Sequence, residues 1–529
     1  MAVGKANELF KEFKEHSVAD FFKKNRQMLG YSSLGRALVT VVHEYVTNSL
    51  DACEEAGVLP NISLSISRLD ENKYSVKVSD NGPGIPKQYV GKVFGKILAG
   101  TKFHRNIQQR GQQGIGAAGC TLFAQVTTGK PVKVISRTQD SAYKCLVGID
   151  TLQNKPIVTE MEDLEKAGDE SETGTTVEGE FGNVKYDSGE HSVYEYIRRT
   201  ALSNPHVEIK FTDPLGKENV FLRSVESVPA RPKVSKLHPL GLTVNDLLEL
   251  SHVSKERKLS TFLVETFARF SPAKAKEIEA IAEGVDMNMT PQNLTWADAE
   301  KLISAFKKVK WIAPEADNLV PIGKERIEFA IKNILDPEYV SVVERKPTVF
   351  RGGIPFIVEA AVSFGGNSGK KVSDEESSGN ILRFANRVPL LFDTGNCAIT
   401  VAVRSVQWKR YGIDFDNQPI SVLVNVSSTY IPYSGVGKEA IAQEDDIINE
   451  IKLAVMDAAR GVQRYISGKQ QVNYDKSRYR TVMRYTSQLS KDLSTLTGIP
   501  EAEIKAELEK VVAKHYPRVE QESVVKEGD

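Results

Sequence analysis

The sequence predicts an α+β protein of several domains, and three observations carry this prediction. Helical and β-type patterns alternate from residue 31 to about residue 229, as in a layered α/β domain. Residues 236–312 have helical patterns throughout. After about residue 313, strand-like runs precede one long helical pattern. A chain of 529 residues has room for three or four such domains with large cores.

The first segment, residues 1–30, is a polar arm that carries four phenylalanines: Phe10, Phe13, Phe21 and Phe22. So many exposed aromatic side chains near a chain end are unusual for a monomer. The arm is therefore expected to dock, either on its own domain or on a partner.

A helix around Glu44 presents three polar side chains in one direction. Glu44, Asn48 and Asp51 stand at i, i+4 and i+7, and apolar residues surround the face that they share. Buried carboxylates cost free energy unless they meet a cation or hydrogen-bond donors, and this helical face carries no Lys or Arg. The face therefore predicts a ligand site. Asn48 offers the amide oxygen that suits Mg²⁺, and Glu44 is placed to deprotonate a water that attacks a γ-phosphate.

A second segment, Asp80-Asn81-Gly82-Pro83-Gly84, follows a strand-like run at residues 73–78. An ionised carboxylate only accepts hydrogen bonds, so Asp80 matches the exocyclic amino group of adenine and not the carbonyl of guanine. Gly82 and Gly84 would let the backbone approach a flat base where a Cβ would collide.

Two glycine-containing segments complete the pattern. The loop Gly111-Gln112-Gln113-Gly114-Ile115-Gly116 enters a run of small residues that begins with Ala117 and Ala118. Such a loop presents backbone N–H groups and a helix N-terminus to phosphates. Gly174-Thr175 follows later, and Thr175 is expected to hydrogen-bond near Asp80. Each segment alone is weak evidence, but the four in this order predict an ATP site.

The C-terminal half of the chain divides into a helical and a mixed region. A linker is expected at residues 228–232, because two prolines lie in it. Thr295 and Asp298 form a capping box, and Ser271-Pro272 begins another helix. Strands are predicted at residues 357–362, 398–403 and 422–426, a polar loop at 374–378, and a helix from Ile447 to Ile466.

Composition excludes several classes of protein. Lys and Arg number 69, as do Asp and Glu, so a nucleic acid would have to bind local patches. The four cysteines are scattered, without metal-site spacing, and are expected to be reduced core residues. No leader-like segment and no run of 18 apolar residues occurs in the sequence, so a cytoplasmic protein that is not secreted is expected.

The ordered motifs resemble the GHKL ATPase superfamily of gyrases, ninety-kilodalton heat-shock chaperones, histidine kinases and mismatch-repair ATPases. The resemblance to the B subunits of archaeal type IIB DNA topoisomerases (topoisomerase VI) is closer and covers about residues 18–466. It rests on the glycine loop and on residues 127–132, 384–391, 408–412, 431–433 and 437–442.

This resemblance implies a domain order. A strap at residues 1–30 precedes a GHKL (Bergerat) α/β sandwich ATPase domain at 31–229. A helix-two-turns-helix domain at 230–312 follows. A transducer domain at 313–470 has a four-stranded sheet and a long C-terminal helix, and a helical tail occupies 471–529.

The resemblance also implies roles for further residues. Lys438 is expected to contact the γ-phosphate, and Thr101 and Lys102 to contact the nucleotide under a lid. The sequence Trp408-Lys409-Arg410-Tyr411 interleaves aromatic and cationic residues, which suits a nucleic-acid backbone; a Trp that packs against its own domain explains it equally well. Relatives often have Arg and Glu near the positions of His43 and Thr47, so the surroundings of Glu44 are expected to differ here.

The implied function is that of the ATP-hydrolysing subunit of a DNA topoisomerase. ATP with Mg²⁺ drives self-dimerisation, and one duplex of double-stranded DNA then passes through a break in another, which relaxes supercoils and decatenates DNA. The break is made by a separate A subunit in an A2B2 heterotetramer, since no winged-helix tyrosine or acidic metal cluster is evident here. The alternatives are a heat-shock-type chaperone, a histidine kinase and an ATP-gated scaffold without strand passage.

Overall fold

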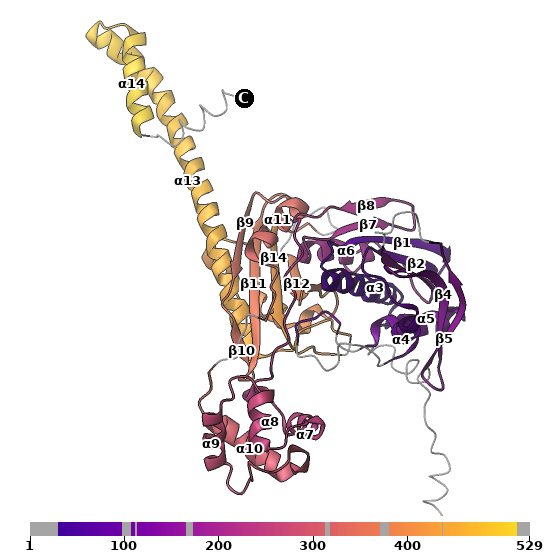
Figure 1. Cartoon of the computed structure of the whole chain (residues 1–529). Helices are drawn as coiled ribbons and strands as arrows, with labels where there is room; N and C mark the ends of the chain where they lie inside the picture. The colour runs from indigo at the N-terminus through magenta and orange to yellow at the C-terminus, as the bar shows by residue number, and fades with distance from the viewer. Residues whose placement is uncertain are drawn as a thin grey trace, which may run out of the picture. The chain divides into compact units, whose positions relative to one another are not determined.

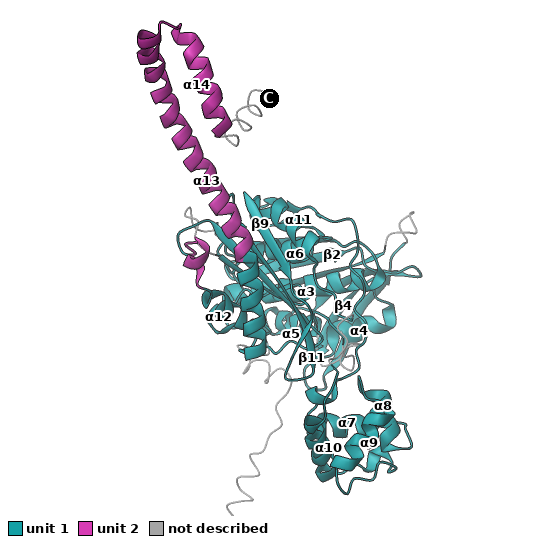
Figure 2. Cartoon of the chain, turned by 90° about the vertical axis from the view of Figure 1, so that its left-hand side faces the viewer, with its two compact units in different colours: residues 1–406, 416–458 teal, residues 407–415, 459–529 magenta. Residues whose placement is uncertain are grey.

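The computed structural model describes residues 30–97, 107–111, 114–165, 173–312, 318–370, 380–435 and 437–515. The chain divides into two compact units, residues 1–406 with 416–458 and residues 407–415 with 459–529 (Figure 2). The predicted arm, except Gly30, and the predicted polar loop at 374–378 lie outside the described residues.

An eight-stranded sheet forms the base of the N-terminal α/β domain (Figure 1), in the order β5-β4-β3-β6-β2-β1-β7-β8. Its strands are β1 (Asn61–Asp70), β2 (Lys73–Asp80), β3 (Val132–Arg137), β4 (Ala142–Asp150), β5 (Lys155–Asp163), β6 (Gly174–Gly182), β7 (Glu208–Thr212) and β8 (Glu218–Phe221). In β1, Ile62, Leu64 and Ile66 are buried in alternation with more exposed residues, so one face of the strand meets the core.

Four helices pack on this sheet: α3 (Leu34–Ala56), α4 (Lys87–Gly95), α5 (Gly116–Thr128) and α6 (Val193–Ser203). Helix α3 begins after Ser33, whose hydroxyl accepts from the Arg36 N–H. It ends at Gly57, which takes a left-handed conformation that costs glycine little. The fold class predicted for residues 31–229, an α/β sandwich, is therefore the one observed.

A separate helical module follows. It consists of α7 (Val244–Val253), α8 (Leu259–Thr266), α9 (Pro272–Ile281) and α10 (Trp296–Lys308), with 3-10 turns at Pro239–Gly241 and Pro291–Asn293. Thr295 and Ser271 are the N-caps of α10 and α9, as predicted, but the Asp298 carboxylate accepts from the Thr295 hydroxyl and does not complete the predicted capping box. The module has its own core, which includes Leu247, Phe262 and Phe306.

The third region contains a six-stranded sheet in the order β10-β11-β14-β12-β13, with β9 paired to β11. Its strands are β9 (Tyr339–Glu344), β10 (Thr348–Phe350), β11 (Ile354–Phe364), β12 (Asn380–Ala385), β13 (Val388–Pro389) and β14 (Ile420–Ser428). Its helices are α11 (Lys324–Leu335), α12 (Ala398–Arg404) and the long α13 (Asp445–Thr497). The sheet thus has six strands and not the four that the resemblance implied, and the strands predicted at residues 357–362 and 422–426 lie in β11 and β14.

The prediction of a strand at residues 398–403 is wrong, because this segment forms α12. Ala398, Ile399, Ala402 and Val403 are all buried, and their spacing of one and four residues matches one face of a helix. Burial of this face overrides the β propensity of the branched residues.

The second unit contains a 3-10 turn at Trp408–Tyr411, the C-terminal part of α13, and α14 (Glu501–His515) (Figure 2). Trp408 is buried and stacks on Phe415 at 5.0 Å between ring centroids. Lys409 and Arg410 are exposed on the same turn. All four cysteines are buried and none forms a disulfide, as expected. Within the described ranges, no helix is both long enough and apolar enough to span a membrane.

Candidate functional site

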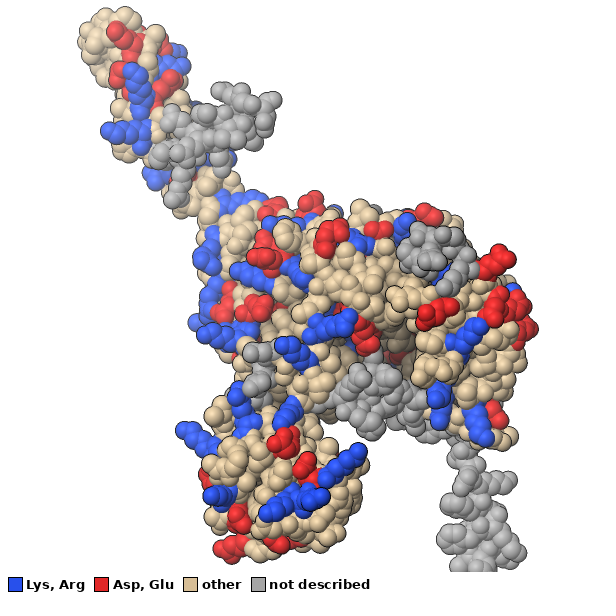
Figure 3. All heavy atoms as spheres, viewed as in Figure 1, with Lys and Arg blue, Asp and Glu red and all other residues tan. Residues whose placement is uncertain are grey.

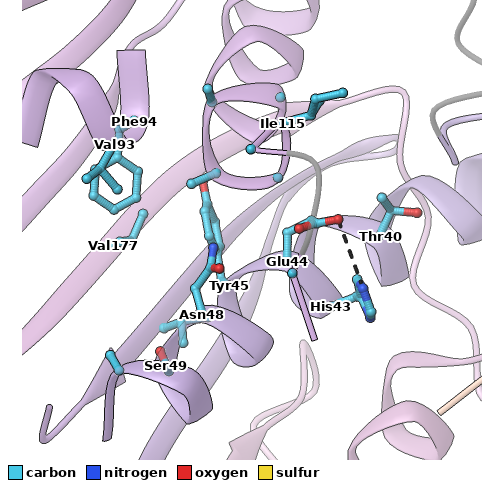
Figure 4. A pocket seen from close by; sticks show the side chains of 18 of the residues that line it. Thr40, His43, Glu44, Tyr45, Asn48, Ser49, Val93, Phe94, Ile115 and Val177 are labelled. Carbon is cyan, nitrogen blue, oxygen red and sulfur yellow. Dashed lines mark ion pairs between the residues drawn. The ribbon is translucent and has the colours of Figure 1, made fainter. Parts of the chain in front are cut away.

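A cavity of about 590 Å³ lies within the first unit, and Figure 4 shows part of its lining. This volume falls within the range of small-molecule sites. Residues from both the α/β domain and the third region line it. Those predicted from the sequence are Glu44, Asn48, Asp80, Gly84, Gly111, Gly114, Ile115, Gly116, Ala117, Ala118, Thr175 and Lys438.

Helix α3 brings Glu44 and Asn48 to the cavity (Figure 4). Within the described part of the chain, neither side chain has a hydrogen-bonding partner, so both can interact with a ligand. The glycine at 116 is a steric requirement, because a Cβ there would overlap the Glu44 carboxylate. This close approach places the N-terminus of α5 beside the carboxylate.

His43 lies next to Glu44, with 4.0 Å between its Nε2 and Glu44 Oε1. Burial lowers the pKa of His43; the Glu44 carboxylate opposes this and the Lys438 ammonium adds to it. Thr47 donates its hydroxyl back to the His43 carbonyl one turn earlier. His43, at one of the two positions that the sequence analysis singled out, therefore lies beside Glu44, and Thr47 bonds to the backbone of that residue.

Asp80 lies at the end of β2 and accepts three hydrogen bonds. The Ser49 hydroxyl donates to Oδ2 at 2.7 Å, and the N–H groups of Gly82 and Thr175 donate to Oδ1 at 3.0 and 3.2 Å. Burial raises the pKa of Asp80, and these donors oppose the shift. These three donors therefore hold the carboxylate in one orientation.

Two glycines near Asp80 are required by close backbone approaches. Gly84 has φ of +73°, and a Cβ there would overlap the Arg137 carbonyl. Gly174 would similarly collide with the Asp80 carbonyl. Gly82 contacts Asp80 but does not line the cavity.

The N-terminus of α5 opens onto the cavity. Its N-cap, Ile115, provides no side-chain hydrogen bond, so the first N–H groups of the helix have no side-chain cap. Such groups bind phosphate oxygens in water-poor sites. The predicted contacts of Gln112, Gln113, Thr101 and Lys102 lie outside the described residues.

Lys438 reaches the same cavity from the segment between β14 and α13. Its Nζ donates to the carbonyl of Arg110, immediately before the glycine loop, at 3.3 Å. Its own backbone is left-handed, with φ of +53°. The fold therefore brings together two residues, Glu44 and Lys438, that are far apart in the sequence.

Asp51 occupies a different environment from Glu44 and Asn48. It does not line the cavity, and Arg110 Nη1 pairs with its Oδ1 at 2.7 Å. The helix face carries no cation of its own, as the sequence indicated, but the loop at residue 110 supplies one.

A buried charge cluster, formed by Asp51, Glu54, Arg110, His206 and Arg387, was missed by sequence reasoning. Glu54 accepts from Arg110 at 2.6 Å, from Arg387 at 2.8 Å and from His206 at 2.9 Å. Burial opposes ionisation of Glu54, but the two guanidinium groups outweigh it and hold the pKa well below its usual range. Since Arg387 follows β12, the cluster joins α3 to the third region. The position of Arg110 directly before the glycine loop was its only sequence signal.

Comparisons with known proteins identify two regions of the chain. A family profile for "Histidine kinase-, DNA gyrase B-, and HSP90-like ATPase" matches residues 34–179, and one for "Topoisomerase VI B subunit, transducer" matches residues 314–478. Among solved structures, the ATPase domain of Thermus thermophilus gyrase B is similar at a TM-score of 0.41 and 12% identity, over 90% of this chain and 98% of that chain.

Curated relatives match almost the entire chain. The B subunit of type 2 DNA topoisomerase 6 from Pyrococcus horikoshii is 43% identical over 99% of this chain and 99% of its own. That of Methanothermobacter thermautotrophicus is also 43% identical, over 96% of this chain and 97% of its own. Identity of this extent across both ATPase and transducer regions shows that the chain belongs to the family of type 2 DNA topoisomerase 6 B subunits.

Proposed function

We propose that this chain is the ATP-binding and hydrolysing subunit of a type 2 DNA topoisomerase, and that it works with a partner subunit on DNA. The observation that carries the proposal is the convergence of Glu44, Asn48, Asp80 and the N-terminus of α5 on one cavity that Lys438 also lines. A scaffold without ATPase activity would have no need of a base, an amide ligand and a phosphate-binding helix end in one place.

Each group has a role in this proposal. Glu44 orients and deprotonates the attacking water, and the N–H groups of Gly114 to Ala118 hold phosphates. Asp80 accepts from the adenine amino group, for which Oδ2 keeps lone-pair capacity beside Ser49. Lys438 contacts the γ-phosphate, and Thr101 and Lys102 are proposed to contact the nucleotide, as the family resemblance implies.

Mg²⁺ fits the donors present at the cavity. Asn48 lines the cavity and offers a hard amide oxygen. This matches an ion that binds through one side chain, phosphates and waters. Bound there, Mg²⁺ would neutralise charge on the phosphates.

ATP binding is proposed to drive dimerisation of two copies of this chain through their N-terminal arms. With two A subunits they would form an A2B2 assembly that passes one duplex through another. Closure on ATP and reopening after hydrolysis is a population shift, so dimer affinity must differ strongly between nucleotide states.

DNA contacts are proposed at local cationic groups, because the chain has no net charge. On the face shown in Figure 3, Lys and Arg are interspersed with Asp and Glu. Exposed candidates in the helical module are Lys255, Lys258, Lys276, Lys307, Lys308 and Lys310. Lys409 and Arg410 are further candidates, since the buried Trp408 and Tyr411 anchor their turn.

The first test is ATP hydrolysis and supercoil relaxation by this chain with its candidate A subunit, with and without duplex DNA. We expect Glu44→Gln to bind ATP and dimerise, but to lose about 100-fold or more in kcat, because the base is missing. Glu55→Gln, an exposed position on the same helix, is the control and should keep full activity.

Two results would contradict the proposal. Rapid ATP hydrolysis by Glu44→Gln would contradict the assignment of Glu44 as the general base. Nucleotide-dependent dimerisation without any response to DNA would retain the ATP site but favour a chaperone or scaffold.

A further inference from the structure

We propose that Arg36 and Glu439 are positioning residues whose ion pair holds Lys438 at the nucleotide cavity. Arg36 lies in the first turn of α3, and Glu439 directly follows Lys438 in the chain. The inference rests on the proposed function, in which Lys438 contacts the γ-phosphate.

The Arg36–Glu439 ion pair is bidentate and largely shielded from water. Arg36 Nε donates to Glu439 Oε1 at 2.6 Å, and Arg36 Nη2 pairs with Oε2 of the same carboxylate. The two side chains are 18% and 11% exposed. A two-pronged guanidinium–carboxylate contact fixes orientation as well as distance, which a single point charge does not.

The place of Arg36 in its helix supports a role in this contact. A cation in the first turn of a helix is disfavoured by the helix dipole, and the first turn of α3 contains no acidic residue. Groups of the third region offset this unfavourable interaction of the Arg36 charge with the helix dipole. Besides Glu439, Asp393 Oδ2 lies 3.6 Å from Arg36 Nη2, and the guanidinium carbon lies 4.8 Å from the centroid of the Phe392 ring.

The segment that carries Lys438 needs such an anchor. An antiparallel β-bridge between Tyr433 and Ile441 joins the two ends of this segment, and the Ser434 N–H donates to the Ala440 carbonyl at 2.9 Å. At its tip, Lys438 adopts φ of +53°, a left-handed conformation that is strained for a residue with a Cβ. Glu439 is the adjacent residue, so its ion pair stabilises this backbone directly.

The same ion pair connects Lys438 to α3, the helix that carries the proposed general base Glu44. Glu44 follows Arg36 by eight residues on α3, a rise of about 12 Å along the helix axis. Phe392 and Glu439 themselves line the cavity. The ion pair therefore sets where Lys438 lies relative to Glu44.

The test is a double-mutant cycle on steady-state ATP hydrolysis by the full chain with its A subunit. Glu439→Gln is expected to lower kcat about tenfold, with KM for ATP within about twofold, because a misplaced lysine weakens transition-state contacts. In a Lys438→Ala background, Glu439→Gln should cause no further loss. Arg36→Met should behave as Glu439→Gln does, and Arg36→Lys should recover part of the activity.

A matched ion pair provides the control. Arg345 Nε and Glu450 Oε1 are 2.6 Å apart, the side chains are 30% and 15% exposed, and neither lines the cavity. Glu450→Gln should keep kcat unchanged while it shifts the thermal unfolding midpoint as much as Glu439→Gln does.

The outcomes separate this inference from the proposed function. A further loss caused by Glu439→Gln in the Lys438→Ala background, or an equal loss in Glu450→Gln, would overturn the positioning role. Wild-type kcat in Glu439→Gln together with a defective Lys438→Ala would overturn the positioning role alone. Wild-type kcat in Lys438→Ala would overturn the proposed role of the lysine itself.

Discussion

At the scale of single residues, the orientation of Asp80 is central to the proposed recognition of adenine. Three donors point at its two oxygens, so an amide at this position must turn its NH2 group toward at least one of them. We expect Asp80→Asn to weaken ATP binding about tenfold or more, since a buried donor is left unpaired and the acceptor for adenine is disturbed. Isothermal titration with ATP measures this. Asp140→Asn, at an exposed turn, should bind ATP as the wild type does.

At the scale of elements, the buried charge cluster links α3 to the segment that follows β12. Replacing Arg387 by Met leaves Glu54 with less compensation for its buried charge, which costs about 3–5 kcal/mol in comparable cases. We therefore expect a large drop in the urea midpoint of Arg387→Met. A urea midpoint of Arg387→Met equal to that of the wild type within error would contradict this prediction.

The same cluster predicts a pH dependence. The folded-state pKa of Glu54 lies well below its ordinary value of 4.5, so the folded state holds fewer protons than the unfolded state near that pH. The stability that Glu54 contributes is therefore fully present above pH 4.5 and declines as the pH falls below it. Urea unfolding at pH 7 and near pH 4 should show a smaller difference between wild type and Glu54→Gln at the lower pH. The exposed neighbour provides the control, because Glu55→Gln should differ little from wild type at either pH.

At the scale of the whole molecule, the cavity belongs entirely to the first compact unit. Every lining residue in the described part of the chain precedes residue 440, whereas residues 471–529 belong to the second unit. Ile466 is the last residue of the buried apolar series on α13. A chain that ends at residue 470 should therefore bind ATP within about twofold of full length, since no ligand contact is removed. Titration of both forms with ATP tests this, and a tenfold weaker affinity would show that the tail supports the site.

The parts of the fold and site that were predictable have local signals. The helix of Glu44 and Asn48, the strand before Asp80 and the glycine loop each depend on residues a few positions apart. Spacing within one helix or turn is determined by backbone geometry, so the sequence alone predicted a shared ligand for these segments, whereas the domain order was implied by the family resemblance.

Other features depended on packing between distant segments. The helix at residues 398–404 formed against its β propensity because burial of one face outweighed that propensity. The pairing of Asp51 with Arg110, of Glu54 with Arg387 and of Arg36 with Glu439 had no periodic signal in the chain.

The sequence by itself therefore determined the ATPase class and the family, and it predicted the chemical roles of Glu44, Asn48 and Asp80, which stay predictions. Only the tertiary structure decided which charges meet, and hence how Lys438 and the third region reach the same cavity. The physical reason is that an ion pair depends on the distance between two side chains in space. That distance is set by the packing of whole elements and is not encoded in local residue spacing.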